Sequence, residues 1–135
     1  MKQQFMERLE QSEQYTLSVA EAMPEKEYGF RPAAGVWNFG ELMHHIAYGI
    51  GWWEANYMLM KETAWAPQPS PEDKKTLTKE LRKAYAALRL TLEGLKMEEN
   101  EIAGFYATLD HITHHRGQAT MHLRLKGIVP PEYVY

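Results

Sequence analysis

Apolar residues recur at intervals of three or four through four stretches of this 135-residue sequence, which is the spacing of amphipathic helices. Four helices of about 20 residues, each about 30 Å long, suit a four-helix bundle. We find no stretch with the alternation typical of a strand. We therefore expect an all-α four-helix bundle that forms a single domain over residues 1–135, with helices at about 2–23, 39–60, 71–95 and 102–126.

Helix boundaries are marked by capping residues, proline and glycine. Asn38 followed by Glu41 has the spacing of a capping box at the start of the second helix. The fourth helix, expected to begin between Ile102 and Phe105, should end at Lys126 because Gly127 follows it. The third helix has several candidate starts, which are Ser70-Pro71, Thr76 and Thr78.

Residues 24–37 separate the first two helices and contain two prolines and two glycines. This segment reads as a connection, and it is long enough to cross the bundle. We therefore expect a long crossover connection between the first and second helices.

Composition excludes several classes of protein. The net charge of -3 and the pI near 6.1 argue against a nucleic-acid partner, which usually requires a basic surface. The chain has no cysteine, so disulfides, cysteine metal ligands and cysteine nucleophiles are excluded. No apolar run approaches the roughly 20 residues that cross a membrane, and the N-terminal residues lack the apolar region of a signal peptide. We expect a cytoplasmic protein.

Histidines are concentrated near the C-terminal end of the sequence. His111 and His115 are four residues apart, so both imidazoles lie on one face of a helix, as two zinc ligands do. Gln118 and His122 extend this polar row by two further turns, and His114 lies beside it. Such a row either borders the core in solvent or points into a metal-binding pocket.

A third imidazole would complete a three-histidine site with a position open to water or substrate. The candidates are His44, His45, His114 and His122. His45 is the best placed, because it shares its helix face with apolar Leu42 and Trp52, and Gly49 leaves room beside its imidazole. His44 is about 100° away, toward the edge of that face.

Several neighbouring residues have both a functional and a purely structural interpretation. Arg116 could line a pocket for an anionic substrate, or could pair with a carboxylate such as Asp110. Gly117 costs about 1 kcal/mol relative to alanine inside a helix, which suggests close approach of another helix or a ligand. Glu41 could orient an imidazole, although its capping role already explains it. Tyr48, Trp52 and Trp53 are read as packing residues.

At these residues the sequence resembles the DinB-like (DinB/YfiT) superfamily of bacterial four-helix-bundle metalloproteins. The resemblance is strongest at His111-x-x-x-His115-Arg116-Gly117-Gln118. It extends over most of the chain through the other matching segments, which are Phe30–Pro32, Gly35–Leu42, His45–Tyr48, Trp52-Trp53, Leu123-Arg124 and Gly127–Pro131. The family implies a bundle with a long crossover, often a homodimer, and one divalent metal held by three histidines. Carried over by position, the metal ligands are His45, His111 and His115. His44 departs from the small or apolar residue usual there.

The resemblance implies more than one activity. Some relatives transfer low-molecular-weight thiols such as bacillithiol or mycothiol, and others have been called metal-dependent hydrolases. We therefore expect a divalent metal, zinc or nickel, at a site that acts on a small molecule, with an external thiol as a further cofactor. The alternatives are a non-enzymatic stress-related binding protein with a structural or regulatory metal, and a metal-free polar network of histidines.

Metal ligation requires neutral imidazoles. The reference histidine pKa therefore predicts that metal affinity falls as the pH drops through about 6.5.

Overall fold

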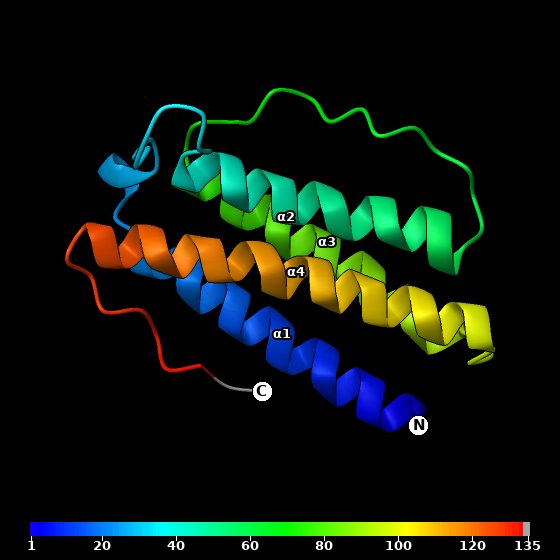
Figure 1. Ribbon diagram of the computed structural model, residues 1–135. Coiled ribbons are helices and arrows are strands. Elements are labelled where there is room, and N and C mark those ends of the chain that lie inside the picture. Colours follow the sequence, from blue (N-terminus) through cyan, green and yellow to red (C-terminus); the bar gives the residue numbers. More distant parts are fainter. Residues whose placement is uncertain (134–135) are drawn as a thin grey trace.

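The computed structural model describes residues 1–133 and is helical throughout its regular elements (Figure 1). The elements are α1 (Lys2–Ala22), the 3-10 turn η1 (Glu25–Glu27), α2 (Phe39–Trp53), the π-helical turn η2 (Glu54–Met58), α3 (Lys74–Gly94) and α4 (Glu99–Leu125). No strand occurs within these described residues. The expected all-α four-helix bundle is confirmed. Among the described residues, no helix combines the length and the apolar character needed to cross a membrane.

The helices occupy the four corners of the bundle in an order different from their order in the chain. α1 packs against α3 and α4, and α2 packs against the same two helices. α1 and α2 are therefore diagonal to each other, so the connection formed by residues 23–38 crosses the bundle. This agrees with the long crossover expected between the first two helices.

A second long connection, residues 59–73, runs back along the bundle from the end of η2 (Figure 1). α3 consequently starts at the same end of the molecule as α2 and runs parallel to it. Lysine side chains fix both ends of α3 against α1. The Lys74 ammonium donates a hydrogen bond to the carbonyl oxygen of Met23 at 3.0 Å, and that of Lys2 donates to the carbonyl oxygen of Leu95 at 2.6 Å.

The start of α2 is as predicted, whereas the start of α3 is not. Asn38 Oδ1 accepts a hydrogen bond from the Glu41 backbone N–H at 2.7 Å, and Glu41 Oε1 accepts one from the Asn38 N–H at 3.0 Å. This is the expected capping box. The N-cap of α3 is Asp73, whose carboxylate accepts from the Thr76 N–H at 2.9 Å. The candidate cap at Ser70-Pro71 was therefore wrong, and the helix begins at Lys74, two residues before the candidate start near Thr76 and four before the one near Thr78.

α4 begins at Glu99, three residues before the earliest expected start. Glu101 Oε1 accepts a hydrogen bond from the Glu98 N–H at 3.3 Å and holds this earlier turn. The helix ends at Leu125, one residue before Lys126, and Gly127 follows in the left-handed conformation at φ 75°. The glycine stop signal is confirmed, because its N–H donates to the Arg124 carbonyl oxygen at 2.9 Å.

The core lies along the axis of the bundle and receives apolar side chains from all four helices. Burial of these side chains is the main favourable contribution to folding. Its fully buried members include Leu9 and Val19 of α1, Met43, Ile46 and Ile50 of α2, Leu77, Leu81, Tyr85, Leu88 and Leu92 of α3, and Phe105, Ile112, Ala119 and Leu123 of α4. The same packing holds α2 and α4 side by side, which determines where their histidines meet.

Candidate metal centre

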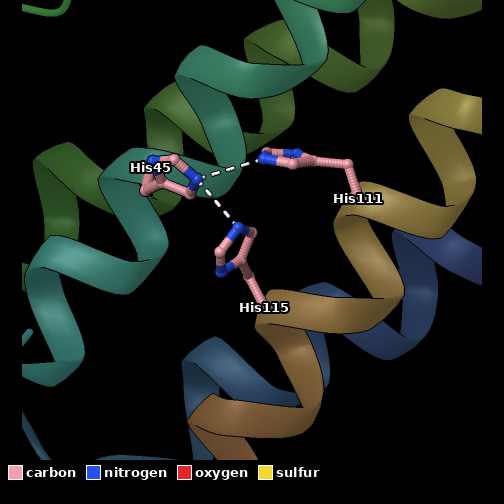
Figure 2. A group of neighbouring side chains, drawn as sticks. All are labelled: His45, His111 and His115. Atoms are coloured by element: carbon pink, nitrogen blue, oxygen red, sulfur yellow. Dashed lines mark hydrogen bonds between the residues drawn. The ribbon is translucent and has the colours of Figure 1, made fainter.

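Three imidazole rings from α2 and α4 point toward one another (Figure 2). His45 comes from α2, and His111 and His115 lie one turn apart on α4. The Nε2 atom of His45 lies 3.0 Å from Nε2 of His111 and 2.9 Å from Nε2 of His115. One ligand atom from each of the three residues lies within 4.8 Å of those from the other two. The structure thus brings together the three residues that the sequence predicts as a metal site.

Gly49 allows this convergence. It lies one turn after His45 on α2, and a Cβ atom there would lie 2.3 Å from His111 Cε1. No real Cβ contact is that short, so any larger residue would displace His111. The sequence indicated that Gly49 makes room for an imidazole, but the imidazole is that of His111 rather than that of His45.

The hydrogen-bonding capacity of the three rings fits a cation better than a metal-free network. His115 Nδ1 lies 2.9 Å from the amide oxygen Oε1 of Gln118, so Nδ1 carries the proton and Nε2 presents a lone pair. A proton on His45 Nε2 can be donated to only one of its two neighbours. In the absence of a cation, at least one of the two contacts of His45 Nε2, with His111 Nε2 or with His115 Nε2, therefore has no proton shared between its two nitrogens. A bound cation would accept the lone pairs of these nitrogens.

The spacing is also close to what a metal ion needs. Two nitrogen ligands of a tetrahedral zinc ion, each about 2.0–2.1 Å from it, lie about 3.3 Å apart. The two Nε2 distances from His45, 3.0 and 2.9 Å, are slightly shorter than that. Small side-chain adjustments would open them to the ligand spacing.

The environment keeps the three imidazoles neutral. Burial is the main cause that lowers the pKa of His45 and of His111 from 6.5 to about 4. The neighbouring histidines add to the effect, because two imidazolium charges would repel each other. Burial also lowers the pKa of His115, although its hydrogen bond to Gln118 opposes the shift. The rings therefore present uncharged nitrogen donors at neutral pH, which is the form that binds metals.

Three tryptophans surround the histidine cluster. The centroid of the Trp37 ring lies 4.4 Å from that of the His45 ring, and the centroid of the Trp65 ring lies 5.3 Å from that of the His45 ring. Trp53 lies 5.9 Å from His111. Trp65 belongs to the 59–73 connection and was missed by the sequence analysis, because that segment has no helical periodicity that could place it. The tryptophans therefore cover part of the three imidazoles, which are half-buried.

An apolar cleft of about 490 Å³ adjoins the cluster through His115 and Gln118. Its other lining residues come from the segment before α2, from α2 and from the C-terminal half of α4, and include Val36, Trp37, Met121 and Leu125. These four side chains are exposed by 40 to 59%. The cleft can therefore receive the apolar part of a small molecule next to the histidines.

The other histidines are engaged elsewhere. The two ring nitrogens of His44 contact Glu80 Oε2 at 2.9 Å and the Gln68 carbonyl oxygen at 2.8 Å. His122 is buried, and its ring nitrogens contact the carbonyl oxygens of Gln118 and Trp37 at 3.0 and 2.8 Å. His114 is exposed. None of the three contributes a ligand atom to the cluster formed by His45, His111 and His115, although the His114 ring lies 4.8 Å from that of His115, centroid to centroid.

Tyr48 and Trp52 hold the 59–73 connection in place. The Tyr48 hydroxyl accepts a hydrogen bond from the Ala66 N–H at 2.9 Å, and the Trp52 indole donates to the Thr63 carbonyl oxygen at 3.1 Å. These contacts lie on either side of Trp65. Both residues therefore have the structural role expected from the sequence, and they position a tryptophan that touches the cluster.

Two expectations for the segment after His115 need correction. Arg116 is buried, but it forms an ion pair neither with Asp110 nor with any other carboxylate of the described residues. A Cβ atom on Gly117 would meet no atom within 4 Å, so no other helix approaches this glycine. Both residues face away from the cluster, toward α1 and the C-terminal segment.

A four-helix bundle in which α2 and α4 contribute three converging histidines defines the class of protein: a helical bundle with a cluster suited to one metal ion. The sequence profile of the DinB superfamily matches residues 8–119. The chain belongs to this superfamily, as the resemblance predicted.

Two solved structures show the same fold. A DinB-like protein from Bacillus cereus ATCC 10987 superposes with a TM-score of 0.80 at 20% identity, covering 96% of this chain and 95% of that one. The DinB-like protein YjoA from Bacillus subtilis gives a TM-score of 0.72 at 18% identity, covering 96% of each chain. At these identities the likeness shows the fold alone. A comparison with curated proteins gave no match.

Proposed function

We propose that His45, His111 and His115 hold one divalent metal ion, zinc or nickel, at a site that activates a small molecule. The observation that carries this proposal is the convergence of their three Nε2 atoms, which the surroundings keep as neutral lone-pair donors. Neutral imidazole suits zinc and nickel equally well.

The donor set favours a site with a free position over a closed structural one. Structural zinc sites take four protein ligands, whereas catalytic ones take three and leave a position for water or substrate. In the described part of the chain, no fourth histidine, cysteine or carboxylate joins the cluster. His44 and His122, two of the other candidate ligands, have other partners.

A divalent metal bound there lowers the pKa of a water or thiol molecule that takes its free position. The chain itself supplies three further functions. The side-chain oxygen of Gln118 accepts a hydrogen bond from the Nδ1–H of His115 and so fixes the orientation of that ring. This keeps Nε2 of His115 directed at the metal position. Trp37, Trp53 and Trp65 cover part of the imidazoles and so reduce their contact with water. The apolar cleft beside His115 receives the substrate.

Of the two activities expected for such a site, we favour transfer of a low-molecular-weight thiol of the bacillithiol type over hydrolysis. Among the described residues, no aspartate or glutamate lines the adjoining cleft, so these residues offer no carboxylate base for water there. A thiol, with a pKa of about 8.5, needs far less help than water to lose its proton. Since the chain has no cysteine, the thiol comes from outside. Its sulfur bonds to an electrophilic carbon, the leaving group departs with its electron pair, and the thiol proton passes to solvent.

Cobalt-loaded protein tests the free position directly. We expect its visible absorption to change when a small thiol such as 2-mercaptoethanol is added, because sulfur enters the coordination sphere. The His111→Ala variant, treated identically, should show no such spectrum. A cobalt spectrum of the wild type that thiols leave unchanged would contradict the proposal and support the alternative of a closed structural or regulatory metal.

A screen for thiol transfer tests the activity itself. Metal-loaded and chelated protein are incubated with a thiol and a panel of alkyl halides and epoxides, and thioether formation is measured by mass spectrometry. We expect product above the uncatalysed rate with loaded protein only. Hydrolysis of an ester panel without any thioether would instead favour the second activity.

A further inference from the structure

A second cleft lies on the side of α4 opposite the histidine cluster, between α1, α4 and residues 129–133. Its volume is about 560 Å³, within the range of small-molecule sites. Arg116 forms part of its wall, although the preceding residue His115 belongs to the metal centre. The Tyr15 hydroxyl donates to the Pro131 carbonyl oxygen at 2.9 Å and so fixes the C-terminal wall to α1.

Arg116 is a buried charge that has no opposite charge beside it within residues 1–133. The residue is 4% exposed, and it takes part in none of the ion pairs of the described residues. Its neighbours are neutral: Nη1 donates to Thr16 Oγ1 at 3.1 Å and to the Ser12 carbonyl oxygen at 3.4 Å. A buried arginine is normally paired, because removing its charge from water is costly.

Part of the guanidinium remains available to a ligand. It has five N–H donors, and in the described part of the chain its hydrogen bonds come from Nη1 alone. Among the described residues, the fully buried side-chain polar atoms without a hydrogen-bond partner belong to Thr78 and His111, and none belongs to Arg116. The unbonded donors of Arg116 are therefore still reached by solvent through the cleft.

The rest of the cleft suits an organic anion. Arg124 adds a second positive charge, whereas Glu132 is the only carboxylate among the described lining residues and pairs with neither arginine there. The guanidinium carbon lies 4.8 Å from the centre of the Tyr15 ring. The lining therefore combines excess positive charge with an aromatic surface.

Gly117 provides an independent observation. It lines the cleft, and a Cβ atom there would have open space within 4 Å. The packing of the protein thus does not explain a glycine in the middle of α4, where it weakens the helix. A ligand that lies against the helix at this point would explain the glycine, because a larger side chain would occupy the space of the ligand.

We propose that this cleft binds a small organic anion, whose carboxylate or phosphate group pairs with Arg116 and whose flat apolar part lies against Tyr15 and Gly117. A planar guanidinium can hold either anion through two parallel hydrogen bonds. The site is separate from the metal centre, so its occupancy does not depend on a bound metal.

The experiment measures binding of benzoate and of phenyl phosphate to the metal-free chain of residues 1–135 by calorimetry, with neutral benzamide as the control ligand. We expect both anions to bind at concentrations below about 10 mM and to raise the melting temperature, while benzamide does neither. The His111→Ala variant should bind them as the wild type does. If neither anion binds at about 10 mM, or if His111→Ala abolishes binding, the proposal is wrong.

Two pairs of variants locate the site. Arg116→Met should weaken anion binding at least about tenfold, whereas Arg82→Met removes the same charge from an exposed position and should not. Gly117→Leu should block the cleft while leaving the helix intact, and Gly51→Leu, at another glycine with open space, is its control. If Arg116→Met fails to fold, the comparison of Gly117→Leu with Gly51→Leu still tests whether the anion binds in this cleft. Unchanged anion binding in folded Arg116→Met or in Gly117→Leu would overturn the proposal.

Discussion

Gly49 and Gly51 are two residues apart on α2 but have different reasons to be glycine. At Gly49 a Cβ atom would lie 2.3 Å from His111 Cε1, whereas at Gly51 it would have open space. The first glycine is required by an imidazole on another helix. The second glycine only lowers the stability of its own helix. Substitutions at the two positions can therefore distinguish an effect on the histidine cluster from an effect on helix stability.

We predict that Gly49→Ala lowers metal affinity at least about tenfold, because His111 must move away from the other two ligands. Gly51→Ala should leave metal affinity unchanged and stabilise the protein by up to about 1 kcal/mol. Titration with zinc, together with urea unfolding, measures both effects. Equal metal affinities in the two variants would show that the position of His111 is not critical.

The pKa values of the cluster give its pH dependence. In the folded chain the pKa of His45 and of His111 is about 4, whereas in the unfolded chain it returns to the ordinary 6.5. Between these values the unfolded state binds more protons, so the metal-free protein should lose stability as the pH falls from about 6.5 toward 4. Urea unfolding of the metal-free chain at several pH values measures this loss.

The same values revise the pH range of metal binding. Protons compete for His45 and His111 of the folded chain only near pH 4, and burial lowers the pKa of His115 as well, so zinc occupancy of the folded protein should persist below pH 6 and be lost toward pH 4. The ordinary histidine pKa predicted a loss near 6.5, which neglected the burial of the rings. Equilibrium dialysis at several pH values measures the occupancy. Half-loss near pH 6.5 would indicate that the imidazoles are exposed to solvent.

At the scale of the elements, the local signals placed some helix ends well and others poorly. Asn38 with Glu41, and Gly127, mark their ends through backbone interactions that depend only on neighbouring residues. The start of α4 depends on Glu98 and Glu101, and glutamate is not a favoured N-cap residue. That start was therefore expected several residues too late.

The start of α3 gives a test of this distinction. Asp73 caps the helix through the Thr76 N–H, whereas the Ser70 hydroxyl bonds only to the Pro71 carbonyl oxygen. We predict that Asp73→Ala lowers the free energy of unfolding by about 1 kcal/mol. Ser70→Ala should change it by less than about 0.5 kcal/mol. Chemical denaturation measures both, and a larger effect at Ser70 would place the start of the helix there.

The candidate site was predictable where helical spacing determined it. His111 and His115 share a face because they are four residues apart, and His45 follows from the inward face of its helix. Trp65 was not predictable, because it reaches His45 from a connection without periodicity. The partners of His44 and His122 also depend on distant segments, since one contacts Gln68 and the other contacts Trp37.

At the scale of the whole molecule, the order of the helices explains why one face carries the cluster. α2 and α4 are far apart in sequence but adjacent and antiparallel in the bundle, so His45 meets His111 and His115 (Figure 2). The long connections, residues 23–38 and 59–73, bring Trp37 and Trp65 to the same face. The connections thus enclose the cluster as well as joining the helices.

The surface of the bundle predicts self-association. Large apolar side chains remain exposed outside the cleft beside His115, including Met60, Leu90 and Tyr106. Exposed apolar area of this kind is often covered by a partner. We predict a homodimer with twice the chain mass of 15.7 kDa, measured by light scattering after size-exclusion chromatography. A mass of one chain at micromolar concentration would contradict this.

Metal content measured by mass spectrometry on protein prepared without a histidine tag tests the central claim most directly. We predict about one zinc or nickel ion per wild-type chain after loading and dialysis, and far less than one in His45→Ala, His111→Ala and His115→Ala. His114→Ala, which removes an exposed histidine outside the cluster, should retain the full metal content. Full metal content in any of the three ligand variants, or none in the wild type, would contradict a metal centre at these residues.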